Sequence, residues 1–212
     1  QLSPFLSVTI LFFSHSTLTS NKKVNKLKTD FRKETWEIKN KTLHLQENKE
    51  ERIMKQIKLE INIRGLHYNE LTEKDRKLID AACEATKRSY APYSHFAVGA
   101  AALLENDIVI TGTNQENAAY PSGLCAERTT LFYANSQYPD QAVKTLAIAA
   151  RTENDFLDTP IPPCGACRQV LLETEKRYGK PMRILLYSKT DIYILENVSG
   201  LLPLSFDGNY LK

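Results

Sequence analysis

Three cysteines and one glutamate constrain this chain of 212 residues more than any other feature. Cys164 and Cys167 form a C-x-x-C, and Cys125 lies far earlier in the chain with Glu127 two residues after it. A C-x-x-C lets one turn of chain supply two thiolates to a tetrahedral Zn²⁺. The fourth cysteine, Cys83, lies in a stretch that predicts a helix, so the count favours three protein ligands, as in catalytic zinc sites. Such a site requires a fold that brings two distant segments together.

Glu127 has the chemistry that an open zinc site requires, because a metal-activated water still needs a base to take its proton. We expect Cys125 and Cys164 each to begin a helix, where the free backbone N–H groups favour a thiolate. Arg128 and Arg168 directly follow motif residues, and we expect them to hydrogen-bond the ligand sulfurs. An ordinary surface arginine is an equally good interpretation for Arg168.

Other uses of the cysteines explain fewer of these residues. A disulfide within the C-x-x-C needs an oxidising compartment, and the chain has no convincing export signal. A redox C-x-x-C would leave Cys125 and Glu127 unexplained. A structural zinc module that binds a partner would need a fourth ligand, recruited from His95 or Cys83. Zinc-dependent catalysis accounts for the whole set.

The pattern of apolar residues alternates between helix and strand after residue 71. Thr72 is the expected N-cap of the first helix, with Asp75 three residues on. The predicted helices span residues 73–90, 125–137 and 164–178, and the predicted strands 96–104, 108–113, 144–151, 183–188 and 192–196. Two strands followed by helix, strand, helix and strand predict an α/β fold: a three-layer α/β/α sandwich around a mixed sheet of five strands.

The first 53 residues differ in composition from the rest. They hold ten Lys or Arg and six Asp or Glu, a net charge of +4, which leaves 18 and 19 in the remainder, a net of −1. We expect residues 1–53 to be a non-native or disordered extension and residues 54–212 to be the domain, with Met54 as the native start. The alternative is a native arm, mostly disordered or helical around residues 31–57. The apolar run at residues 5–13 is far shorter than the ~18 residues of a membrane span.

Three blocks tighten the interpretation of the cysteines. They are APYSHFAVGAA at residues 91–101, NQENAAY at 114–120 and CAER at 125–128. Together with the P-C-x-x-C at 163–167, they resemble the zinc-dependent nucleoside and nucleobase deaminases, in the variant with cysteine as the first ligand. The resemblance covers roughly residues 71–206 and is closest to the small, homotetrameric cytidine deaminases.

The resemblance implies a substrate site as well as a metal site. The positions that match substrate contacts of the family are Phe96, Asn114, Glu116, Tyr120, Ala126 and Phe206. Phe96 is expected against the pyrimidine ring, and the backbone of Ala126 is expected to orient the base. Asn114 and Glu116 are separated by one residue at a strand end, so we expect them to point to the same side. The resemblance implies that they bind the sugar. Phe206 is expected to reach the active site of a neighbouring subunit in a homotetramer, with Tyr120 at the same interface.

The implied activity is hydrolytic deamination of cytidine and deoxycytidine to uridine and deoxyuridine, with loss of ammonia, in pyrimidine salvage. A zinc-activated hydroxide would attack the ring while Glu127 shuttles the protons. The alternative is a deaminase of blasticidin-S-type nucleosides, against which the block at 114–120 and Phe206 argue. The composition of the nearly neutral domain gives no sign of the basic groove that polynucleotide-binding enzymes usually have. We therefore expect a small nucleoside substrate, Zn²⁺ as cofactor, no nucleic-acid or membrane partner, and a cytoplasmic location.

Overall fold

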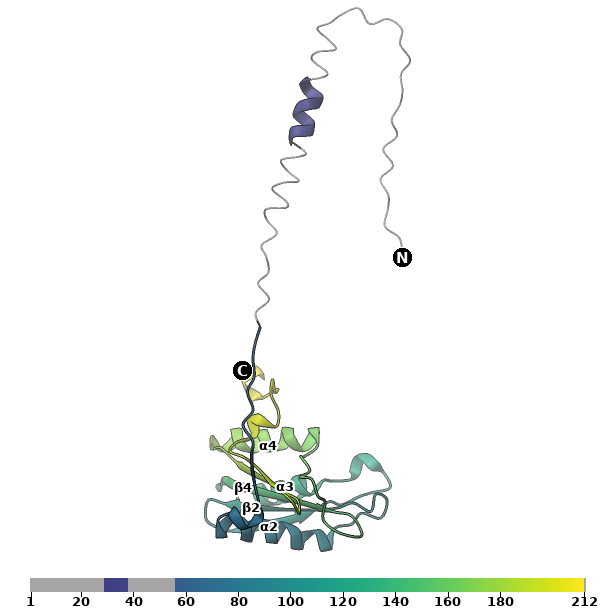
Figure 1. Ribbon diagram of the computed structural model, residues 1–212, viewed down its shortest axis with the longest axis vertical. Helices are drawn as coiled ribbons and strands as arrows, with labels where there is room; N and C mark the ends of the chain where they lie inside the picture. Colours follow the sequence, from purple (N-terminus) through teal and green to yellow (C-terminus); the bar gives the residue numbers. More distant parts are fainter. Residues whose placement is uncertain (1–28, 38–55, 212) are drawn as a thin grey trace, which may run out of the picture. The chain divides into compact units, whose positions relative to one another are not determined.

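The computed structural model describes residues 29–37 and 56–211 (Figure 1). The chain divides after Ile57 into two units, and each is described by itself. In the first unit, residues 29–37 form an α-helix. The predicted boundary between residues 53 and 54 lies outside the described residues, as does the apolar run at 5–13. All elements discussed below belong to the second unit.

A mixed sheet forms the centre of the second unit. Its strands are β1 (Arg64–Leu66), β2 (Ala97–Leu104), β3 (Val109–Thr113), β4 (Val143–Arg151), β5 (Arg183–Tyr187) and β6 (Ile192–Leu195). They lie in the order β1-β6-β5-β4-β2-β3. Strands β4 and β5 run parallel, whereas the other neighbours in this sheet are antiparallel. The mixed α/β class predicted from the sequence is confirmed.

The predicted count of five strands is wrong by one, because β1 adds a sixth strand at the edge of the sheet. This strand has three residues, and Arg64 and Gly65 within it are exposed. It forms by pairing antiparallel with β6, with Gly65 opposite Tyr193. So short a segment with an exposed glycine carries little strand signal of its own, and its conformation depends on the neighbouring strand.

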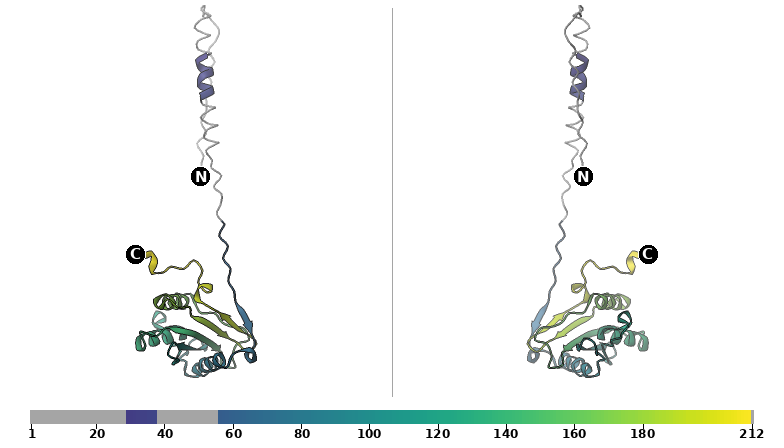
Figure 2. Two further views of the ribbon diagram at one scale, coloured as in Figure 1. Left: turned by 90° about the vertical axis from the view of Figure 1, so that its left-hand side faces the viewer. Right: turned by 90° about the vertical axis from the view of Figure 1, so that its right-hand side faces the viewer.

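Helices cover both faces of the sheet (Figures 1 and 2). Helix α2 (Glu73–Ala85) packs on one face, with Leu78 and Ile79 against the buried side chains of β2 and β4 that point the same way. Helices α3 (Ala126–Gln137) and α4 (Gly165–Tyr178) pack on the other face, around Leu131 and Leu171. Two separate apolar cores therefore hold three layers together. No helix in the described part of the chain is both long and apolar enough to cross a bilayer.

Most helix ends lie where the sequence predicts them. The Thr72 hydroxyl accepts a hydrogen bond from the backbone N–H of Asp75, as expected of an N-cap. Gly179 ends α4 in the left-handed conformation, with φ of 62°. The first helix is shorter than predicted, since it ends at Ala85 and a 3₁₀ turn follows. The chain leaves the helix there because Tyr90 N donates to the carbonyl of Asn114, beyond the end of β3.

Gly99 allows α2 to lie directly against β2. A Cβ atom at this position would lie 2.1 Å from the carbonyl oxygen of Ala82 and 2.8 Å from the backbone nitrogen of Thr86. Both atoms belong to the backbone, so a rotamer change cannot relieve the overlap. The short separation between helix and strand therefore depends on a residue without a side chain.

We predict that Gly99→Ala lowers the free energy of unfolding by about 1–3 kcal/mol, the usual cost of overpacking. Urea denaturation measures the change. Gly208→Ala is the matched control, because a Cβ there meets nothing within 4 Å. Equal midpoints for the two variants would show that α2 does not need this close approach.

Candidate metal centre and active site

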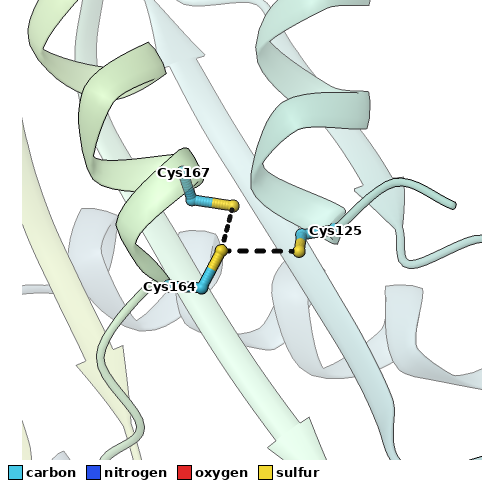
Figure 3. A group of neighbouring side chains, drawn as sticks. All are labelled: Cys125, Cys164 and Cys167. Atoms are coloured by element: carbon cyan, nitrogen blue, oxygen red, sulfur yellow. Dashed lines mark hydrogen bonds between the residues drawn. The ribbon is translucent and has the colours of Figure 1, made fainter. Parts of the chain in front are cut away.

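The structure brings three cysteine sulfurs together at the N-terminal ends of two helices (Figure 3). Cys125 is the N-cap of α3 and Cys164 the N-cap of α4, while Cys167 lies in the first turn of α4. The Sγ atoms of Cys125 and Cys164 are 3.8 Å apart, and those of Cys164 and Cys167 are 3.4 Å apart. All three sulfurs lie within 4.8 Å of one another.

This donor set fits zinc. Zn–S bonds of about 2.3 Å in a tetrahedral arrangement place neighbouring sulfurs about 3.8 Å apart, close to the separations seen here. Within residues 29–37 and 56–211, the cluster includes neither His95 nor Cys83. His95 Nδ1 instead lies 3.1 Å from Glu153 Oε1, and Cys83 packs against the core beneath α2. Three protein donors are the set that catalytic zinc sites use, whereas structural sites use four.

The chemical state of the cysteines also suits a metal. All four are free thiols, so the C-x-x-C forms no disulfide. A hydrogen bond from Cys167 and the nearby Arg128 guanidinium lower the pKa of Cys125 to about 5. The same contact with Cys125, together with burial, raises the pKa of Cys167 well above its usual range. One negative charge is thus already held on the sulfur at the N-terminus of α3, where the helix dipole stabilises it.

Arg128 lies beside the sulfurs, as the sequence predicts. Its NH2 group is 3.9 Å from Cys125 Sγ and 3.5 Å from the carbonyl oxygen of Gly123. The thiolate and its neighbours raise the pKa of the guanidinium further. The buried Nε of Arg128 has no hydrogen-bond partner among the described residues. A fixed positive charge therefore faces a cluster of sulfurs that becomes more negative with every proton it loses.

Arg168 does not make the predicted contact with sulfur. Its Nε donates to the carbonyl of Pro163 and its NH1 to the carbonyl of Leu201, each at 2.8 Å. Two backbone acceptors lie within reach of the planar guanidinium, and they take its hydrogen bonds. Arg168 thus joins the start of α4 to the C-terminal segment.

Glu127 lies in the first turn of α3, two residues after the Cys125 sulfur donor, and is only 5% exposed. Burial raises the pKa of its carboxyl, and the negative charge on Cys125 raises it further. A carboxyl held in this way can keep a proton nearer to neutral pH than an exposed glutamate can. The structure thus places a buried acid or base directly beside the three sulfurs.

A cavity of about 500 Å³ opens beside Cys125 and Arg128. Three of the predicted substrate-contact residues line it: Asn114, Glu116 and Tyr120. Its volume lies within the range of small-molecule sites. Cys125 of the sulfur cluster and the predicted sugar-binding residues therefore line one cavity.

The Asn114 side chain is almost fully buried and its polar atoms are engaged. Its Oδ1 accepts hydrogen bonds from Ser89 Oγ at 2.5 Å and from Val98 N at 2.8 Å. Its Nδ2 donates to the carbonyl of Phe96 at 2.9 Å. Asn114 therefore joins the end of β3 to the segment that leads into β2.

The carboxylate of Glu116 organises another part of the cavity lining. Its Oε2 accepts hydrogen bonds from the backbone N–H groups of Tyr93 and Ser94, at 2.9 and 3.2 Å, and its Oε1 accepts one from the Ser94 hydroxyl. The Ser94 hydroxyl is the main cause of a lowered pKa at this carboxyl. Glu116 is thus an anion that holds one turn of backbone at the mouth of the cavity.

The remaining predicted contacts are spread more widely. Ala126 is fully buried behind Cys125, and Phe96 is half-buried just before β2. Tyr120 is 77% exposed, with its ring 6.2 Å from that of Tyr93. Phe206 is 59% exposed and stacks on Tyr210, away from the residues that line this chain's cavity.

Tyr93 and Ser94 also line the cavity, and neither was predicted to have a role in the site. The signal was present, since both lie within the block at residues 91–101 that carries the resemblance. Their part in the wall depends on Glu116, which lies more than twenty residues later in the chain. Spacing along the sequence could not reveal that contact.

Comparison with known proteins agrees with this site. The family model for the cytidine and deoxycytidylate deaminase zinc-binding region matches residues 72–178. The cytidine deaminase of Halalkalibacterium halodurans is 48% identical over 96 residues, which cover 45% of this chain and 68% of that protein. The cytidine deaminase of Sporosarcina psychrophila is 46% identical over 97 residues, 46% of this chain and 67% of that protein.

A solved structure extends the similarity to the fold. The crystal structure of cytidine deaminase from Burkholderia pseudomallei is similar to this one with a TM-score of 0.54 and 38% identity. The superposition covers 64% of this chain and 100% of that chain. The matched region contains the three clustered cysteines and Glu127, within half of the chain's length. This chain is therefore a member of the cytidine and deoxycytidylate deaminase zinc-binding family.

Proposed function

We propose that this protein deaminates cytidine and deoxycytidine hydrolytically to uridine and deoxyuridine in pyrimidine salvage, with release of ammonia. The observation that carries the proposal is that Cys125, one of three clustered sulfurs and two residues before the buried carboxyl of Glu127, lines a cavity of about 500 Å³. The names of its relatives support the same substrate class. The deaminase domain is proposed to span residues 54–212, with residues 1–53 as an extension.

Cys125, Cys164 and Cys167 are the proposed zinc ligands. Bound zinc would supply a Lewis acid that makes a water molecule acidic enough to lose its proton near neutral pH. Arg128 donates toward Cys125 Sγ and offsets the negative charge of the thiolates. The three sulfurs already lie together at helix N-termini, which favour thiolates once a cation displaces the remaining protons.

Glu127 is the proposed proton carrier. Its carboxylate takes a proton from water, passes it to ring nitrogen 3 of the pyrimidine, and later delivers a proton to the departing amine. The balance is one water and one cytidine consumed, one uridine and one ammonia formed. The raised pKa of the buried carboxyl brings proton uptake and release closer in energy, which a group that must do both requires.

The walls of the cavity are proposed to hold the nucleoside. Asn114 and Glu116 reach the sugar with the hydrogen-bonding capacity that their contacts to the wall leave unused, and Phe96 and the backbone of Ala126 orient the base. Phe206 is proposed to complete the site of a neighbouring subunit in a homotetramer, with Tyr120 at the interface. Its exposure supports that role, as does the fact that it is not among the residues that line this chain's own cavity. Sedimentation equilibrium measures the proposed stoichiometry.

A substrate panel tests the function. We predict loss of the cytosine absorbance and stoichiometric ammonia release with cytidine and deoxycytidine. Free cytosine lacks the sugar that the wall residues hold, and a nucleotide adds a phosphate beside the anionic Glu116, so cytosine and cytidine monophosphate should react far more slowly. Faster turnover of blasticidin S than of cytidine would overturn the proposal.

A substitution at Glu127 tests the proposed proton carrier. Glu127→Gln removes the proton carrier but keeps the shape of the side chain, so turnover of cytidine should fall by at least ~10²-fold. Zinc content should remain that of the wild type, because this residue is not a proposed ligand. Glu173→Gln, an exposed carboxyl on α4, is the control and should change neither quantity. A rate close to wild type in Glu127→Gln would remove this residue from its role.

A substitution at Cys164 tests the proposed zinc ligands. Cys164→Ala should reduce bound zinc from about one ion per chain to a small fraction, because two thiolates hold zinc far more weakly than three. Atomic absorption measures the content directly, without reference to activity. Cys83→Ala is the matched control and should keep its zinc, since Cys83 lies outside the cluster. Equal zinc in both variants would contradict the proposed ligand set.

A further inference from the structure

The C-terminal segment, residues 202–211, has little apolar burial of its own. It follows Leu201, which is buried in the core, and none of its residues is buried. Leu202 is half-buried against the core, whereas Leu204, Phe206 and Tyr210 are exposed. A segment with so few buried contacts is located mainly by the polar contacts that it makes. The position of Phe206 therefore depends on a small number of hydrogen bonds.

Helix α4, next to this segment, supplies two of these polar contacts (Figure 2). The side-chain Nε2 of Gln169 donates a hydrogen bond to the backbone carbonyl of Phe206 at 3.0 Å. Two helical turns further on, Lys176 Nζ lies 3.5 Å from Asp207 Oδ2. An ion pair with an exposed lysine contributes little, so the hydrogen bond from Gln169 is the stronger of the two contacts.

The end of the segment is ordered by contacts within itself. The carboxylate of Asp207 accepts a hydrogen bond from Asn209 N at 3.0 Å, and its backbone carbonyl accepts one from Tyr210 N at 3.3 Å. The ring of Phe206 stacks on that of Tyr210, with centroids 5.8 Å apart and planes 13° from parallel. Residues 206–210 thus form one small unit, and its attachment to α4 decides where the ring of Phe206 lies.

The same helix is also fixed to the sulfur cluster. Cys167, in the first turn of α4, is two residues before Gln169. Arg168 lies between them, and its NH1 donates to the carbonyl of Leu201 at 2.8 Å, just before the segment begins. Three consecutive residues of α4 therefore connect the metal cluster, the start of the C-terminal segment and Phe206.

We propose that Gln169 is a positioning residue, whose hydrogen bond holds Phe206 where its ring can enter the active site of a neighbouring subunit. This inference rests on the proposed function, in which Phe206 completes that site. Helix α4 would then serve two active sites, because it ligates the metal of its own subunit and presents Phe206 to the next. Without the donor, the ring would occupy other positions, and the neighbouring site would lose part of its wall. The expected effect is weaker binding of the nucleoside.

A double-mutant cycle on the full-length, zinc-loaded protein tests whether Gln169 acts through Phe206. Gln169→Ala should raise the KM for cytidine about three- to tenfold, the effect of one hydrogen bond, with kcat and zinc content close to wild type. Phe206→Ala should raise KM at least as much, and adding Gln169→Ala to it should cause no further rise. Glu173→Ala, at an exposed position one turn further along α4, is the control and should keep the wild-type KM.

Mixed oligomers test whether the effect crosses between subunits. Gln169→Ala chains are co-expressed with a large excess of Glu127→Gln chains, which have an intact Gln169 but little activity of their own. Each active site then belongs to a Gln169→Ala chain and receives Phe206 from a Glu127→Gln chain. The KM for cytidine should return to the wild-type value. A purely structural defect within the Gln169→Ala chain would leave KM raised.

The outcomes separate this inference from the proposed function. A wild-type KM in Gln169→Ala, additive effects in the double variant, or a raised KM in the mixed oligomers would each overturn the positioning role while leaving cytidine deamination intact. A wild-type KM in Phe206→Ala would remove both Phe206 and Gln169 from the neighbouring site. Absence of cytidine turnover in the wild type would instead overturn the proposed function, and the positioning role with it.

Discussion

The site depends on the meeting of two helix N-termini on one face of the sheet (Figure 3). Helices α3 and α4 both pack on the same apolar core, and each begins with a cysteine. The parallel pair β4 and β5 is joined through α4, so the start of α4 lies beyond the carboxyl end of β4, where ligand sites of α/β sheets form. The packing of the helices therefore determines the separation of the sulfurs, and the sulfurs need no special loop to reach one another.

The metal residues could be predicted from the sequence because their positions are local. Cysteines at helix starts, a C-x-x-C within one helical turn, and a glutamate two residues after a ligand are all legible without tertiary information. Thr72 and Gly179 mark helix ends for the same reason. Strand β1 could not be predicted, because its conformation comes from pairing with β6 more than a hundred residues later. Arg168 was assigned to sulfur, since the nearby carbonyl of Leu201 is invisible along the sequence.

In the cavity wall, Asn114 and Glu116 combine a structural role with their proposed role in substrate binding. Asn114 and Glu116 together hold the segment between residues 89 and 98 through six hydrogen bonds, four to its backbone and two to serine hydroxyls. These contacts fix the turn that carries Tyr93 into the cavity before any ligand arrives. Preorganised polar groups lose less entropy on binding than mobile ones. A role in shaping the wall and a role in holding a sugar therefore support each other.

The four cysteines show that position in the fold, more than residue type, decides which sulfurs can bind a metal. Cys83 lies within α2 against the apolar core, and burial raises the pKa of its thiol to about 12. Cys125 is the N-cap of α3, and its neighbours lower its pKa to about 5. Zinc binds the thiolate form. The two sulfurs therefore differ by several units in the pH above which they can bind zinc. The helix start, with Arg128 one turn away, supplies the positive environment that the last turn of α2 lacks. Moving a cysteine along its helix by one turn would therefore change the pKa of the thiol more than replacing exposed neighbours of that cysteine would.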